Sequence, residues 1–103
     1  MQIKSDNIEL LTVEQNIYNI LLKFDIFIDQ EELPEIANGL WQQFSALNKL
    51  EHNLGADRES YRFEWQGTQF DLNFESYSQS IWIEPLVAEH ASETKALFDY
   101  LTS

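Results

Sequence analysis

Two histidines of the 103-residue chain stand beside carboxylates, a pairing that metal sites use. His52 follows Glu51 directly in the chain. His90 lies next to Glu89 and three residues before Glu93. Imidazole nitrogens and carboxylate oxygens are both ligands of zinc in proteins, but nothing in this spacing brings the two histidines together, and two imidazoles alone specify little. We therefore interpret both as solvated surface histidines and expect no metal site.

Three serines, Ser76, Ser78 and Ser80, raise the question of a nucleophile for acyl transfer. The chain has no G-x-S-x-G elbow, and no histidine has a reason to lie beside these residues. Serine is common in exposed turns because its hydroxyl hydrogen-bonds the nearby backbone. We therefore interpret the three serines as turn residues.

Glu64 and Asp71 are candidates for paired carboxylates, since a hairpin would place them near each other on its polar face. General acid catalysis needs a desolvated pocket that raises a carboxyl pKa, and an open sheet face supplies none. The chain also has no cysteine, no glycine-rich phosphate loop and no zinc-ligand spacing. The sequence thus predicts no catalytic residue and no cofactor, and an enzyme is the function class with least support.

A binding candidate does occur in the segment FESYSQSIWIEP, residues 74–85. If Ile81 and Ile83 point to the core, strand alternation directs Trp82 to the opposite face. A tryptophan among aliphatic and acidic residues is typical of a protein-binding patch, although a loop, a terminus or a second copy of the protein would also cover it. Together with three residues of an earlier strand on the same face, the partner-binding candidates are Trp82, Ile17, Leu21 and Phe27.

That earlier strand is predicted over residues 17–28, IYNILLKFDIFI, because all six even positions are apolar. A helix is the alternative, since several of these residues also have helical spacing and Thr12 with Gln15 would form a capping box. The strand is preferred because the alternation extends further than the helical pattern. Residues 8–13 would then be its hairpin partner, through a turn at residues 14–16.

Residues 29–50 predict an amphipathic helix, because apolar residues recur there at spacings of three and four. Asp29 followed by Glu32 is typical of a helix N-terminus. Residues 52–60 are predicted to be a polar loop, with Gly55 ending the helix.

The segment YRFEWQGTQFDLNFE, residues 61–75, predicts a β-hairpin with every aromatic side chain on one face. A two-residue turn at Gly67–Thr68 gives the preferred register. A register shifted by two residues joins Arg62 to Asp71 and keeps the same faces, so the faces are better determined than the register.

A further strand follows at residues 81–84, and a last helix lies within residues 88–101, with Ser92 as a candidate N-cap. The order ββαβββα predicts an α+β two-layer sandwich in a single domain over residues 1–103. A mainly antiparallel five-stranded sheet would carry two helices on one face and leave the other to solvent or a partner. The expected core is Tyr18, Ile20, Leu22, Phe24, Leu40, Phe44, Phe63, Trp65, Phe70, Leu72, Ile81, Ile83, Phe98 and Leu101.

Composition limits the partners and the compartment. Apolar residues make up 44% of the chain and aromatic residues 14%, which favours a folded domain over disorder. Eighteen acids against six bases give a net charge of −12, which repels phosphate backbones and anionic lipid and favours basic partners. No apolar run reaches membrane-helix length and the first residues do not form a signal peptide, so we expect a cytoplasmic protein that binds neither nucleic acid nor membrane directly.

The FESYSQSIWIE segment, the acidity and the length resemble small single-domain bacterial proteins grouped in families of unknown function. The resemblance implies no catalytic or binding residue. We expect a non-enzymatic interaction module or regulator that binds a protein partner or itself, with a homodimer through the outer sheet face as one form. The alternative is an acidic nucleic-acid mimic in a basic protein groove, which requires acids aligned on one side. Here the acids are spread over nearly every expected element.

The excess of acids predicts how stability responds to salt. Like-charge repulsion opposes folding at neutral pH and low ionic strength. Raising NaCl from 0.01 to 0.1 M shortens the Debye length from about 30 Å to about 10 Å, so the melting temperature should rise, as followed by circular dichroism. A fall over this range would mean that specific ion pairs outweigh the repulsion.

Overall fold

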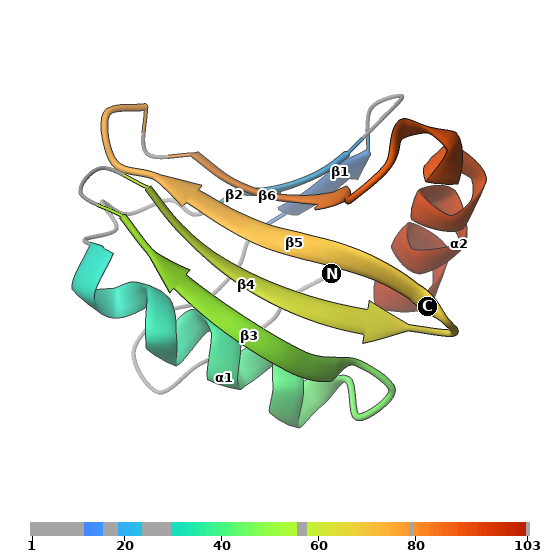
Figure 1. Ribbon diagram of the computed structural model, residues 1–103, viewed down its shortest axis with the longest axis horizontal. Helices are drawn as coiled ribbons and strands as arrows, with labels where there is room; N and C mark the ends of the chain where they lie inside the picture. The colour runs from blue at the N-terminus through green and yellow to red at the C-terminus, as the bar shows by residue number, and fades with distance from the viewer. Residues whose placement is uncertain (1–11, 16–18, 24–29, 56–57, 79, 103) are drawn as a thin grey trace.

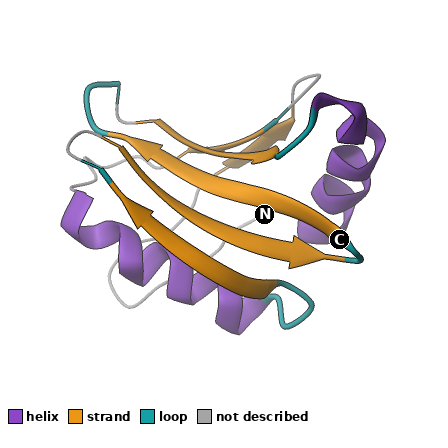
Figure 2. Ribbon diagram, in the orientation of Figure 1, coloured by secondary structure: helices purple, strands orange, loops and turns teal. Residues whose placement is uncertain are grey.

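The computed structural model describes residues 12–15, 19–23, 30–55, 58–78 and 80–102, which form one sheet and two helices (Figure 1). Within these residues the sheet has six strands in the order β1-β2-β6-β5-β4-β3, and every neighbouring pair is antiparallel (Figure 2). The strands are β1 (Thr12–Gln15), β2 (Ile20–Lys23), β3 (Asn48–Leu54), β4 (Arg58–Trp65), β5 (Thr68–Glu75) and β6 (Ser80–Pro85). The helices are α1 (Leu33–Gln43) and α2 (Ala91–Leu101), and a 3-10 turn precedes each, at Gln30–Glu32 and Ala88–His90.

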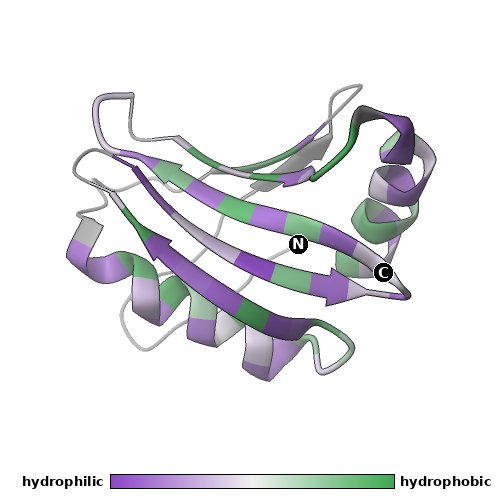
Figure 3. Cartoon of the chain, viewed as in Figure 1, coloured by the Kyte–Doolittle hydropathy of each residue, from purple (hydrophilic) through white to green (hydrophobic). Residues whose placement is uncertain are grey.

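The hairpin of β4 and β5 has the faces that its sequence predicts. Buried residues alternate with more exposed ones along β4, and hydrophobic and hydrophilic residues alternate along both strands in Figure 3. Phe63 and Phe70 are fully buried opposite each other, and their rings stack at 5.6 Å between centroids. The apolar face of this hairpin is therefore the sheet's contribution to the core.

The preferred register of the hairpin is wrong, and the register shifted by two is the one that forms. Arg62 pairs with Asp71, and Thr68 lies in the strand opposite Trp65. The two-residue turn is Gln66–Gly67, where both residues have positive φ angles of 51° and 81°. Positive φ at both central positions is typical of a type I′ turn, whose twist suits a hairpin and which glycine enters without steric cost.

The strand interpretation of the early apolar segment is confirmed for Ile20–Lys23. Ile20 and Leu22 are buried while Leu21 is partly exposed, as alternation requires. β1 pairs with this strand and continues to Gln15, so the turn predicted at residues 14–16 is wrong in its first two positions. Residues 8–11, 16–18 and 24–28 of the predicted hairpin lie outside the described residues.

The first helix is shorter than predicted. α1 ends at Gln43 instead of continuing to residue 50, and Phe44 leaves the helical region with φ −120° and ψ 84°. The N–H of Phe44 still bonds the Leu40 carbonyl at 2.9 Å, and the N–H of Leu47 bonds Phe44 in the turn that follows. Phe44 and Leu47 are both buried, so the predicted apolar residues reach the core although the last of them is not helical.

The N-terminus of α1 also differs from the prediction in part. The N-cap is Glu32, which makes no side-chain capping bond, while Pro34 occupies the first turn, where a missing N–H is tolerated. Asp29, the predicted cap, lies outside the described residues.

The strand β3 was missed by the sequence pattern. Residues 52–54 belong to β3 and residues 58–60 to β4, so the predicted loop over residues 52–60 is wrong. Every residue of β3 is exposed because it is the edge strand, and such a strand shows no alternation of apolar residues. Gly55 belongs to the connection between the two strands, where its N–H bonds the Arg58 carbonyl and a Cβ would lie 2.9 Å from that oxygen.

The last helix forms within its predicted range. Leu97 and Leu101 are fully buried, and Phe98 packs against the core as a partly buried ring. The N-cap of α2 is His90, so the predicted cap Ser92 is wrong and lies inside the first turn. The hydroxyl of the buried Thr94 donates to the His90 carbonyl at 3.0 Å and ties the helix to the 3-10 turn before it.

Both helices pack on the apolar face of the sheet, so the α+β two-layer class with an antiparallel sheet and two helices is confirmed. Trp41 of α1 contacts Phe63 and Tyr100 of α2 contacts Trp65, at 5.4 and 5.6 Å between ring centroids. The sheet has one strand more than predicted because β3 was expected to be helix and loop. Of the predicted core residues, Tyr18 and Phe24 lie outside the described residues, Phe98 is partly buried, and the others are buried.

A matched pair of leucine substitutions tests this assignment of faces. Leu72→Ala removes a fully buried side chain from β5 and should lower the free energy of unfolding by ~2–5 kcal/mol. Leu54→Ala removes the same atoms from a side chain that is 69% exposed on β3 and should change it by less than about 0.5 kcal/mol. Urea unfolding followed by tryptophan fluorescence measures both, and equal effects would contradict the assignment.

Candidate functional site

The structure places Trp82 on the outer face of the sheet, away from the helices. Ile81 and Ile83 are buried on the inner face, and Trp82 between them is partly exposed on the other side. Leu21 is its register partner on β2 and is also partly exposed, so two of the four partner-binding candidates come together. Ile17 and Phe27 lie outside the described residues.

An arginine of the same chain covers part of Trp82. The guanidinium carbon of Arg58 lies 5.2 Å from the centroid of the Trp82 ring, within the range of a cation–π interaction. The same guanidinium is 3.6 Å from the Glu84 carboxylate. The sequence pattern does not reveal this contact, because it predicts a loop at Arg58.

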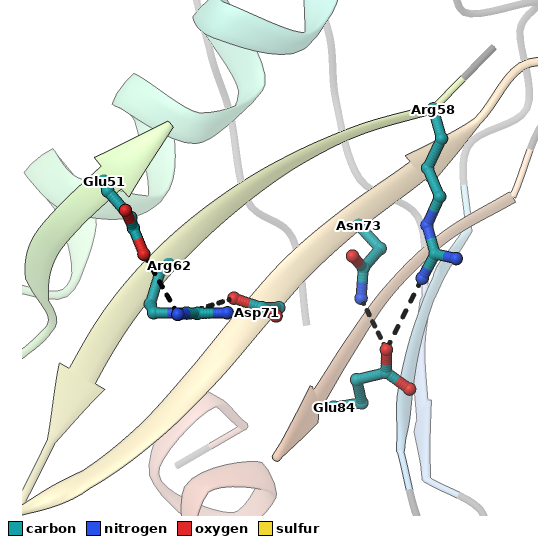
Figure 4. Close-up of polar contacts among 6 residues, drawn as sticks. All are labelled: Glu51, Arg58, Arg62, Asp71, Asn73 and Glu84. Atoms are coloured by element: carbon teal, nitrogen blue, oxygen red, sulfur yellow. Dashed lines mark hydrogen bonds and ion pairs between the residues drawn. The ribbon is translucent and has the colours of Figure 1, made fainter. Parts of the chain in front are cut away.

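The rest of the outer face is occupied by polar pairs across the strands (Figure 4). Arg62 donates from Nε to Asp71 and from Nη1 to Glu51, each at 3.0 Å. The hydrogen bond to Asp71, followed by the charge of that carboxylate, raises the pKa of Arg62. Asn73 donates to Glu84 at 3.0 Å. These groups orient one another across β3, β4, β5 and β6.

The expected carboxylate pair on this face does not take the form of two opposed acids. Register places Glu64 opposite Gln69, and the Asp71 carboxylate bonds Arg62. Solvent-accessible ion pairs contribute about 0–1 kcal/mol each to stability, so the main effect of this part-buried pair is to hold its side chains in place.

Ser76 and Ser78 lie in the connection between β5 and β6, as predicted, whereas Ser80 is the first residue of β6 and pairs with Glu75. Ser78 donates from its backbone N–H and its hydroxyl to Glu75, at 2.7 and 2.6 Å, and lies 2.8 Å from the Ser80 hydroxyl. The side-chain bond from Ser78 is the largest cause of a lowered pKa at Glu75. These hydroxyls therefore stabilise a turn.

A cluster that sequence reasoning missed lies at the β3 edge, where His52, Glu59 and Tyr61 meet. The Nε2 atom of His52 contacts the Glu59 carboxylate, and the His52 ring stacks on Tyr61 at 4.2 Å with an interplanar angle of 1°. The Glu59 side chain is 4% exposed and that of His52 is 41% exposed. His52 is thus an exposed surface histidine, as predicted, but Glu59 and Tyr61 hold it on two sides.

Tyr61 is electrostatically coupled to this cluster. Burial, which is the largest cause, the charge of Glu59 and the hydrogen bond between the two side chains together raise the pKa of Tyr61 to about 12. A buried carboxylate disfavours the phenolate because two negative charges would lie close together in a medium of low polarity. Only the pairing of β3 with β4, which sets His52 opposite Tyr61, reveals the cluster.

An open concavity of about 480 Å³ adjoins the cluster, between the start of α1 and the β3–β4 edge. It is lined by Glu31, Pro34, His52, Leu54 and Glu59. A buried carboxylate that fixes an imidazole at such a wall can bind polar groups or orient the ring for proton transfer. Within the part of the chain that the structure describes, no group of three or more histidine, cysteine, aspartate and glutamate side chains is placed to hold a metal ion.

The fold and these surfaces define a small acidic α+β domain with a six-stranded antiparallel sheet and two helices on one face. The chain belongs to the family described as "Protein of unknown function (DUF3630)", whose model matches residues 8–103, and the resemblance inferred from the sequence is confirmed. No curated protein and no solved structure matches the chain. Among the described helices, none is both long and apolar enough to cross a membrane.

The raised pKa of Tyr61 predicts how stability falls in alkali. The folded state holds this proton more tightly than the unfolded state, whose pKa is 10.0, so the contribution is complete below pH 10 and is lost as pH rises towards 12. Wild type should lose up to about 3 kcal/mol more than Tyr61→Phe across this window. Urea unfolding at a series of pH values measures the difference. Tyr77→Phe, at an 84% exposed position, is the control, and equal losses in wild type and Tyr61→Phe would contradict the coupling.

Proposed function

We propose that the domain is a non-enzymatic interaction module and that the outer face of its sheet docks a basic protein, with Trp82 at the centre of the contact. The observation that carries this proposal is the position of Trp82 on the face opposite both helices. An aromatic residue there adds nothing to the core that the helices cover. Part of the apolar Trp82 ring is therefore exposed to water, and a partner that docked here would bury it.

The neighbours of Trp82 suit a binding centre. Tryptophan and arginine are the residue types most enriched in interface hot spots, and Arg58 lies over the Trp82 ring. Leu21 adds an aliphatic side chain on the adjacent strand. The cross-strand pairs of Arg62 and Asn73 hold the surrounding side chains in place, which lowers the entropy that docking would cost.

Charge selects the partner. The chain carries a net charge of −12, and a second copy would bring the same charge to the contact, so repulsion opposes a homodimer. A protein with lysine or arginine around an apolar pocket is attracted by the negative charge of the chain, and this attraction speeds its association. The acids available around the two arginines of this face are Glu51, Glu64, Asp71, Glu75 and Glu84.

A nucleic-acid mimic has less support than a binding module. Mimicry needs a row of uncompensated charges at the density of a phosphate backbone. On the outer face Arg62 bonds both Glu51 and Asp71, and Arg58 pairs with Glu84, so the central acids are partly neutralised. An enzyme is the function class with the least support.

The proposal predicts the behaviour of two matched aromatic substitutions. Trp82→Ala should keep a cooperative melting transition in circular dichroism, because the inner face is untouched, and should abolish stoichiometric binding of a basic partner in pull-downs from native cells. Tyr77→Ala removes an exposed aromatic ring from the β5–β6 turn and should leave binding unchanged. Light scattering on each purified variant reports self-association.

Three outcomes would contradict the proposal. Partner binding that survives Trp82→Ala places the contact elsewhere. A self-associating protein that becomes monomeric in Trp82→Ala identifies a homodimer. Capture of DNA-binding proteins that salt releases, equally in wild type and Trp82→Ala, favours the mimic.

A further inference from the structure

The concavity at the β3–β4 edge is a second surface, separate from the outer face. Its residues come from the 3-10 turn before α1, the first turn of α1 and the two strands that end nearby, on the helix side of the sheet (Figure 1). A volume of about 480 Å³ lies within the range of small-ligand sites, which is about 300–1,000 Å³. The space is therefore large enough for a small molecule or one long side chain.

One wall of the concavity is fixed in position. The His52 ring is stacked on Tyr61 and contacts Glu59, while Glu59 also accepts a hydrogen bond from Tyr61. Three side chains thus constrain one another across two paired strands. A wall that does not rearrange lowers the entropic cost of binding a ligand.

The charge of the lining selects the sign of a ligand. Glu31 and Glu59 supply two carboxylates, and His52 is the one basic side chain among the described lining residues. Even with His52 protonated, the described lining residues carry a net negative charge, which the charge of the whole chain reinforces. Anions are therefore repelled from the concavity and cations are attracted.

The apolar part of the lining suits a ligand with an apolar stem. Leu54 is 69% exposed and Pro34 is also exposed, so both have apolar surface that a ligand can cover. We propose that the concavity binds an organic cation, an ammonium or guanidinium group carried on an aliphatic stem. The charged head lies towards Glu31 and Glu59, and the stem covers Leu54 and Pro34.

This chemistry has two sources, a free amine or a lysine or arginine side chain of a protein. The inference stands apart from the outer-face proposal, because the lining residues lie on the other side of the sheet from Trp82. Trp82→Ala therefore serves as a variant that should leave binding in the concavity unchanged.

Titrations with compounds that share one stem test the inference. Pentylammonium, 1-pentanol and pentanoate are added separately to the ¹⁵N-labelled protein, and amide shifts of residues 52–54 and 59 are followed by nuclear magnetic resonance. Pentylammonium should shift these amides in a saturable way, while pentanol and pentanoate should not. The blocked peptide acetyl-Gly-Lys-Gly-amide distinguishes the sources, since tighter binding of the peptide indicates a protein side chain and tighter binding of pentylammonium a free amine.

Matched glutamate variants locate the cation. Glu31→Gln should weaken pentylammonium binding roughly two- to fivefold, the effect of one exposed charge pair. Glu35→Gln alters an exposed glutamate in the first turn of α1, outside the described lining, and should have no such effect. Both positions are exposed, so neither change should unfold the protein. The inference is overturned if neither cation binds, if pentanol binds as well as pentylammonium, or if the two variants behave alike.

Discussion

Burial of one face of β4, β5 and β6 under two helices is the constraint on which the rest of the molecule depends. Phe63, Phe70, Leu72 and Ile83 are fully excluded from water on that face. Because side chains alternate along a strand, each buried residue determines the face on which its neighbours lie. Trp82 is on the outer face for this reason, and Arg62 and Asp71 meet there for the same reason. The outer surface is a consequence of the core.

Charge is distributed unevenly over this scaffold. Both arginines lie on the outer face and are engaged with acids of neighbouring strands, so that face is partly neutralised. The concavity beside α1 has two carboxylates and one histidine, and no arginine or lysine, among its described lining residues. With eighteen acids and six bases, ion pairs cannot account for the stability of the chain, and apolar packing must supply most of it. The same imbalance is the reason for proposing a basic partner at the outer face and a cation at the concavity.

The edge strand β3 shows how a polar segment becomes part of the sheet. It pairs with β4 alone and all its residues are exposed, so its apolar burial is small. The stacking of His52 on Tyr61 and the contact with Glu59 attach it to the neighbouring strand through side chains as well as backbone. A register irregularity between Lys49 and Glu51 interrupts the edge, a feature that discourages further strand pairing. The cluster therefore has a structural role whatever binds beside it.

Local periodicity in the sequence is enough to predict the α+β class, the apolar faces of the β4–β5 hairpin and the outward position of Trp82, because it records which side of an element is buried. The end of α1, the strand β3 and the hairpin register depend instead on contacts between elements. The strand Asn48–Leu54 is exposed along its whole length and forms by pairing with β4. Because it buries no face, its sequence shows no alternation of apolar residues. Both hairpin registers bury the same faces, so the register is set by the turn geometry at Gln66–Gly67. His52, Glu59 and Tyr61 meet for the same physical reason, since contact between strands is a property of their pairing and not of the local sequence.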